Sequence, residues 1–160
     1  DGAGRVLLRP KLMAHGLPAL KERLMPSQEV MRRVLLHLEE RRALNVRVAV
    51  RGPKYKSFSI EAALYTRSRM SQELEEEIQE RLYTFLHALH GGQDGQGWRL
   101  GQDVPRASLY QILGGNPEVL SVVSLKTFDE SGAIFPGSLS LKDDELPFLS
   151  GVKLTSAHLA

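Results

Sequence analysis

The sequence predicts an α+β fold, a two-layer sandwich with helices on one face of a mostly antiparallel sheet, in the order (β)αββααββ. Two observations favour this class. Several segments alternate apolar and polar residues with a period of two, which is typical of strands that bury one face. Other segments repeat apolar residues at helical spacing, but they do not separate every pair of strands, as the helices of a parallel sheet would.

The composition limits the classes of protein to consider. A chain of 160 residues, 42% of them hydrophobic, fits one domain with a buried core. The 21 basic and 19 acidic residues nearly balance, which argues against a surface built mainly for nucleic acid. The absence of cysteine excludes disulfides, thiolate nucleophiles and cysteine zinc sites. No apolar run approaches the roughly 20 residues of a membrane span, so we expect no direct membrane insertion.

The first residues predict a short strand followed by a linker. Residues 5–9 have the composition of a strand, and residues 10–26 are interrupted by glycine and proline. The chain begins at Asp1 without a methionine. We therefore expect residues 1–25 to continue from a missing N-terminal region, and residues 26–160 to form a single α+β domain.

A capped amphipathic helix is predicted from Ser27 to about Ala43. Ser27 is a favourable N-cap, and Glu29 lies in the first turn, where the helix dipole favours an acidic residue. Arg41 and Arg42 lie in the last turn, where cations are favoured. The apolar residues share one stripe: Val30, Met31, Val34, Leu35 and Leu38.

Two strands joined by a short connection follow this helix. Residues 45–51 place valines on one face, and residues 55–67 place Phe58 and other apolar residues on one face. Because only Gly52-Pro53 and Lys54 separate the two segments, they predict an antiparallel hairpin. The residues expected on its outward face are Arg47, Arg51, Glu61 and Tyr65.

Two further helices are predicted. The first runs from Ser71 to about Leu89, with glutamates on its solvent side, and Gly91-Gly92 ends it. Its apolar stripe comprises Leu74, Ile78, Leu82, Phe85, Leu86 and Leu89. The second is short, begins at Pro105 and ends before Gly114-Gly115.

The end of the chain predicts two strands around a loop. Residues 119–128 are rich in β-branched residues and predict a strand. Residues 129–145 are polar and predict a loop, and residues 151–156 predict a last short strand.

Several motifs along the chain match the pattern of one known family. They are Glu40-Arg41-Arg42, Gly52-Pro53-Lys54-Tyr55, Gly91-Gly92, Gly97-Trp98 and Gly101, together with the segment 108–128. In their order and spacing they resemble the C-terminal region of baseplate J-like proteins, the baseplate assembly proteins of contractile phage tails and contractile injection systems. The resemblance covers about residues 26–156. One departure is the sequence 114–117, where the family pattern has a valine-glycine-valine-like turn.

The resemblance implies a structural component of a baseplate wedge that acts through protein–protein contacts, without enzymatic activity and without a cofactor. The implied partners are other wedge proteins, a baseplate component with a lysozyme-like fold, and the spike and hub. Self-association through this domain is also implied. The implied location is the bacterial cytoplasm, where the particle is assembled as part of a phage tail or injection system.

Other residues suggest chemistry that we weigh against a structural role. His87 and His90 could share a metal, but a metal site needs three or four ligands and only Asp94 lies nearby in sequence. The glycines of residues 91–101 follow a helix, whereas a dinucleotide fingerprint follows a strand, so they are better read as turn formers. The acidic residues 73–80 fit a solvated helix face better than a pair of catalytic carboxylates.

The arginines between residues 32 and 51 leave one alternative function open, that of a stand-alone α+β module that binds nucleic acid on a basic sheet face. Stacking aromatics are scarce on that face, where Tyr65 alone qualifies, so we expect no nucleic-acid partner. The arginines fit better as partners of acidic neighbours in an assembly. We also expect the loop around Trp98 and the loop containing Phe135 to make contacts, with Trp98 either a packing anchor or an interface anchor.

Overall fold

The computed structural model describes residues 24–158, which form an α+β fold, as predicted. The strand predicted over residues 5–9 lies outside the described residues. The elements, in chain order, are α2 (Gln28–Glu39), β1 (Lys54–Thr66), α3 (Gln72–Phe85), α4 (Arg106–Gly114), β2 (Val119–Asp129) and β3 (Glu145–His158).

The three described strands form one mixed sheet with the order β2-β1-β3. β1 is antiparallel to β2, with Ile60 opposite Thr127, and parallel to β3, with Lys54 opposite Glu145. The prediction of a mostly antiparallel sheet is therefore corrected to a mixed one. The last strand is also longer than predicted, since β3 begins at Glu145 inside the expected loop.

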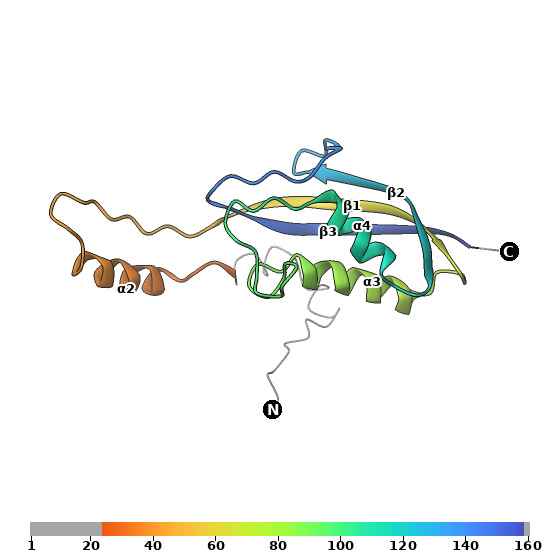
Figure 1. The fold of residues 1–160 in the computed structure, drawn as a ribbon, viewed down its shortest axis with the longest axis horizontal. Coiled ribbons are helices and arrows are strands. Elements are labelled where there is room, and N and C mark those ends of the chain that lie inside the picture. Colours follow the sequence, from red (N-terminus) through yellow and green to blue (C-terminus); the bar gives the residue numbers. More distant parts are fainter. Residues whose placement is uncertain (1–23, 159–160) are drawn as a thin grey trace, which may run out of the picture.

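The predicted hairpin between residues 45–51 and β1 is wrong. Residues 45–53 contain no strand, although most of the segment is extended, and β1 pairs instead with β2 and β3. From Phe58 to Thr66 both edges of β1 are occupied, by β2 and β3, so residues 45–51 could not pair along most of this strand. The segment leads away from the sheet toward α2 (Figure 1).

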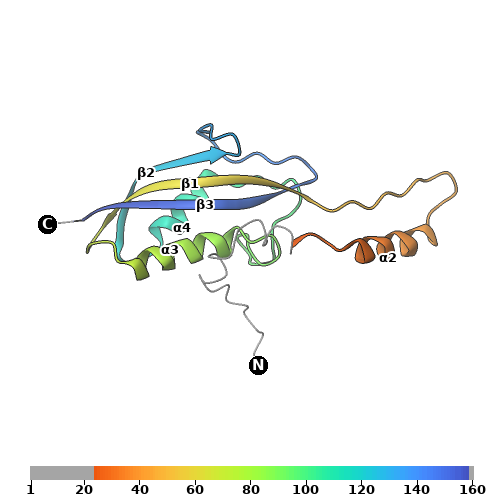
Figure 2. The same cartoon turned by 180° about the vertical axis from the view of Figure 1, so that it is seen from behind.

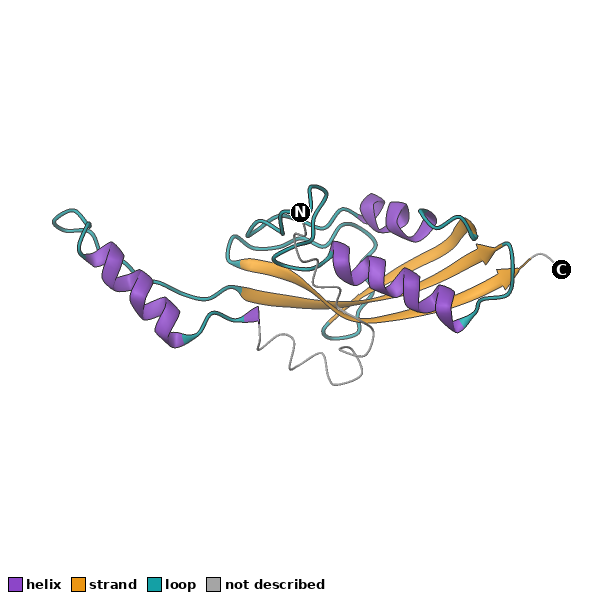
Figure 3. Ribbon diagram, turned by 90° about the horizontal axis from the view of Figure 1, so that it is seen from below, coloured by secondary structure: helices purple, strands orange, loops and turns teal. Residues whose placement is uncertain are grey.

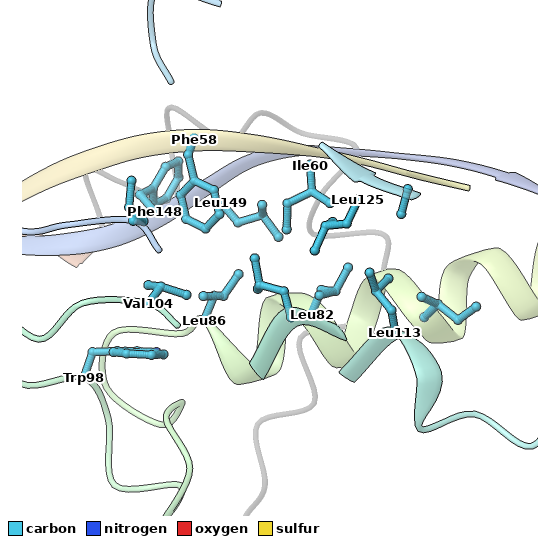
Figure 4. Close-up of a cluster of buried hydrophobic side chains, with 14 of the residues drawn as sticks. Phe58, Ile60, Leu82, Leu86, Trp98, Val104, Leu113, Leu125, Phe148 and Leu149 are labelled. Atoms are coloured by element: carbon cyan, nitrogen blue, oxygen red, sulfur yellow. The ribbon is translucent and has the colours of Figure 1, made fainter. Parts of the chain in front are cut away.

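The core lies between the sheet and the two helices α3 and α4, which lie on the same side of it (Figures 1 and 3). The predicted apolar face of β1 is confirmed: Phe58, Ile60, Ala62 and Leu64 are all buried. Figure 4 shows Leu82, Leu86 and Leu113 directed toward the strands. Each fully buried side chain of this size contributes about 1.5–3 kcal/mol relative to an exposed one.

The N-caps of α2 and α3 follow the sequence closely, whereas the C-terminal ends of both helices come earlier than predicted. α2 ends at Glu39 rather than near Ala43, so Arg41 and Arg42 lie beyond its last turn. The Oγ atoms of Ser27 and Ser71 each accept a hydrogen bond from a backbone N–H three residues later, at 3.2 and 3.1 Å. α3 ends at Phe85 rather than near Leu89, so Leu89 leaves the predicted buried stripe and is exposed. The α4 helix begins at Arg106, with Pro105 at its N-cap.

Residues 28–53 form an extension that we call the arm, and residues 54–158 form what we call the body. The arm consists of α2 and the segment that connects it to β1. Both project beyond one end of the sheet and its helices (Figures 1 and 2). No residue of α2 is buried, despite its apolar stripe. α2 therefore does not lie on the sheet, as a helix of a sandwich would.

Candidate functional site

The four residues predicted to share an outward hairpin face are not on one surface. Glu61 and Tyr65 belong to β1 and alternate with its buried residues, so they lie on the sheet face opposite the helices. Glu61 makes an ion pair with Lys153 of β3, with Oε1 and Nζ 3.5 Å apart. Arg47 and Arg51 are exposed residues of the arm, because the segment that carries them does not pair with β1.

Trp98 is a core residue of the body. Its side chain is 7% exposed, and its indole Nε1–H donates a hydrogen bond to the Phe85 carbonyl oxygen at 2.9 Å. The two rings meet edge to face, with centroids 5.6 Å apart. The indole thus satisfies a carbonyl at the end of α3 and covers the end of the core (Figure 4), so it is a packing anchor and not an exposed interface side chain.

Phe135 also packs against the core of the body. It is half-buried, its ring lies edge to face with Phe58 at 6.4 Å, and its backbone N–H donates to Thr127. The neighbouring Ile134 is exposed instead. In the loop predicted to make contacts, Ile134 and not Phe135 presents apolar surface.

The loop of residues 87–101 is closed by backbone hydrogen bonds. Gly97 N–H donates to the Gly91 carbonyl at 2.8 Å, and Trp98 N–H donates to the Ala88 carbonyl at 3.0 Å. These bonds bring the chain back to the end of α3 and place the indole beside Phe85. The backbone geometry supports the interpretation of the glycines as turn formers.

His87 and His90 stack with ring centroids 5.2 Å apart. The Nδ1 atom of His87 accepts backbone N–H groups from Leu89 and His90, at 3.2 and 3.3 Å. Over residues 24–158 no group of three or more histidine, aspartate or glutamate side chains is arranged to hold a metal ion. The His87 ring therefore acts as an acceptor that shapes the turn after α3.

Replacing His87 with asparagine should weaken the pH dependence of stability. Burial lowers the pKa of His87, and the nearby His90 lowers it further. As the pH falls, the unfolded chain therefore takes up this proton first, and stability is lost below the ordinary histidine pKa of about 6.5. Asparagine can accept the same N–H groups without titrating.

The measurement is urea denaturation of both proteins at about pH 7 and about pH 5, the range in which histidine titrates. The wild-type free energy of unfolding should fall more between these values than that of the His87→Asn variant. An equal fall in both proteins would show that His87 does not contribute.

The arm carries apolar surface that the sequence did not identify as exposed. In α2, Val30, Val34 and Leu38 are 49, 44 and 41% exposed along the predicted stripe. Beyond the helix, Leu44 is 93% exposed and Val46 is also exposed. Within residues 24–158 these apolar side chains remain exposed, unlike those of the core of the body.

The charge of the molecule is divided between the arm and the body. The arm has six arginines and three glutamates, a net charge of +3. The body has ten basic and fourteen acidic residues, a net charge of −4. Five of the acidic residues are on α3: Glu73, Glu75, Glu76, Glu77 and Glu80.

The chain matches no protein-family model, and no curated protein matches it significantly. Among the helices of residues 24–158, none has the length and apolar character needed to cross a membrane.

Proposed function

We propose that the chain is a structural component of the baseplate wedge of a phage-tail-like contractile machine, acting through protein–protein assembly contacts. The observation that carries this proposal is the arm, an amphipathic helix with no buried residue at the end of an extended segment. An isolated helix of 12 residues is only marginally stable in water, since most helical stability in proteins comes from packing of the apolar face. The arm therefore suits a protein whose α2 is covered by another subunit.

The body adds two further surfaces to this proposal. With α3 and α4 as a second layer on one side, as in a two-layer sandwich, the other side of the sheet is open to contact. Small and polar residues occupy much of that side, among them Ser59, Ala63 and Ser124, together with Glu61 and Tyr65. A surface of small and polar side chains fits a wet, assembly-type contact better than a catalytic cleft.

The motifs that resemble baseplate J-like proteins have structural roles that agree with the proposal. Lys54 and Tyr55 lie where the arm joins the body: Lys54 Nζ is 2.6 Å from Asp144 Oδ2, and Tyr55 Oη donates to the Leu24 carbonyl. Residues 91–101 form the loop that holds Trp98 in the core. The resemblance suggests other wedge proteins, a lysozyme-like-fold component, and the spike and hub as the partners.

The nucleic-acid alternative loses its main support. It needs a basic sheet face, and Arg47 and Arg51 are in the arm instead of on the sheet. On the open side of the sheet Glu61 lies between Lys126 and Lys153 and makes an ion pair with Lys153. We therefore favour the assembly function.

The test is co-sedimentation with particles in the bacterium that makes the protein. The tagged protein should pellet with sheath, tube and spike proteins in rod-shaped particles, identified by mass spectrometry and negative-stain imaging. The control is a Val34→Asp, Leu38→Asp variant, which changes only exposed positions of α2 and should stay folded but leave the pellet. Wild-type protein that stays in the supernatant while particles are being made would overturn the proposal.

A further inference from the structure

We propose that the arm of one copy binds the acidic body of a second copy, with α3 as the main contact. The inference rests on the proposed assembly function and deepens it by naming the partner and the two surfaces. Three observations carry it: the uncovered stripe of α2, the opposite charges of arm and body, and the direction of the arm.

Most of the charged groups on both surfaces make no ion pair within residues 24–158. Across residues 24–158, Arg32, Arg33, Arg47 and Arg51 make no ion pair, and Arg41 and Arg42 pair only with glutamates next to them in the arm. No glutamate of α3 pairs with a cation in this part of the chain, and two of them only accept hydrogen bonds from glutamines of the same helix. Opposite charges on two surfaces, most of them without an ion pair, favour contact between those surfaces.

Apolar residues accompany the charges on each surface. In α2, Arg33 lies beside Val30 at one edge of the predicted five-residue apolar stripe. Arg32 lies beyond Leu35 at the other edge, on the side of the helix away from Val34. On the body, the loop after α3 exposes Leu89 and Leu100, which are 59 and 57% exposed. A partner helix that follows α3 would therefore meet glutamates along the helix and leucines at its end.

The direction of the arm makes a second copy the partner. The arm runs away from α3 of its own chain (Figures 1 and 2), whereas every other copy presents the same acidic helix. The two surfaces are different, so each copy offers its arm to one neighbour and its body to another. Head-to-tail contacts of this type produce rings when the rotation closes and filaments when it does not.

The experiment is sedimentation velocity of the full chain over a range of concentrations, at about 50 mM and about 500 mM salt, because salt screens contacts between exposed charges. We expect wild-type protein to associate at low salt and to dissociate at high salt. Two variants reverse the charges, Arg32→Glu with Arg33→Glu and Glu73→Lys with Glu77→Lys, all at exposed positions. Each alone should weaken self-association by roughly tenfold or more.

The two variants should associate with each other when mixed, because the unchanged arm of the α3 variant can contact the unchanged α3 of the arm variant. The two altered surfaces also carry opposite charges at the substituted positions. A chain with all four changes keeps the wild-type net charge and should also associate, which separates the contact from a net-charge effect. Circular dichroism of every variant checks that the fold is unchanged.

Three results would overturn the inference: wild-type protein that stays monomeric at low salt, variants that associate as wild type does, and a mixture that fails to associate. The outcome is distinct from that of the particle experiment. Self-association without co-sedimentation supports this contact and removes the baseplate proposal, whereas co-sedimentation of a protein that is monomeric by this test removes the contact and leaves the proposal in place.

Discussion

Replacing Trp98 with alanine should lower the free energy of unfolding by about 3–5 kcal/mol, the cost typical of deleting a buried aromatic side chain. The substitution removes a ring that is 7% exposed and that packs edge to face on Phe85, and it leaves the Phe85 carbonyl without the indole N–H. The measurement is urea denaturation followed by circular dichroism, because Trp98 is the only tryptophan and its fluorescence is lost with it.

A Trp98→Phe variant separates packing from hydrogen bonding at this position. Phenylalanine retains an aromatic ring beside Phe85 but has no N–H, and the Phe85 carbonyl still accepts the Gly92 N–H at 2.8 Å. The cost should therefore be smaller, about 1–3 kcal/mol for one lost hydrogen bond and a partial cavity. If Trp98→Ala unfolds with nearly the wild-type free energy and loses only assembly, the indole acts as an interface anchor and is not part of the core in solution.

Replacing Gly97 with alanine should have the second large effect, a loss of about 2–5 kcal/mol. Gly97 has φ +93°, a conformation that costs an L-residue about 1–2 kcal/mol. A Cβ atom there would also lie 2.6 Å from the Ala88 carbonyl oxygen, and backbone displacement to relieve such overpacking costs about 1–3 kcal/mol more. Since Gly97 N–H closes the loop onto Gly91, the displacement would disturb the neighbouring indole.

Gly95 provides the matched control for that prediction. It also has a positive φ, +69°, but no heavy atom lies within 4 Å of the position a Cβ would take. Gly95→Ala should therefore cost only the conformational term, about 1 kcal/mol. Urea denaturation of both variants gives the two losses in free energy of unfolding. Equal losses would mean that the loop adjusts to the added methyl group and that the close contact at Gly97 does not destabilise the variant.

The local elements of the body could largely be predicted from residue patterns. In β1 the period-two alternation correctly identified Phe58 and Ile60 as core residues, and in α3 the helical spacing did the same for Ile78 and Leu82. Capping serines located the starts of α2 and α3. These signals are local, because they depend only on residues within one or two turns, and the local structure follows them.

Strand pairing could not be predicted in the same way. Residues 45–51 have a strand pattern, and a strand pattern shows that a segment can pair but not which strand it joins. One neighbour of β1 is β3, which is separated from it in sequence by two helices and β2. The extent of β3 was underestimated because Pro147 and the polar residues before it resemble a loop.

The exposure of the proposed contact residues was the least predictable feature. The stripe of α2 identified an amphipathic helix, and such a stripe is usually covered by the same chain. Whether the stripe is covered depends on where the helix lies in the fold, and the spacing of apolar residues gives no information about that position. Trp98 illustrates the converse, since sequence alone left its role between core and interface open, and the hydrogen bond to Phe85 assigns it to the core.

The parallel pairing of β1 with β3 has a consequence for how the chain folds. On a ribosome, β1, α3, α4 and β2 are all made before residues 145–158, so one edge of the central strand has no partner until the end of β3 is synthesised. Pairing across so much intervening chain carries the entropy of closing a long loop, which slows folding. An intermediate with β1 exposed on one side would be the species most prone to aggregate during synthesis, and the one a chaperone would be expected to hold.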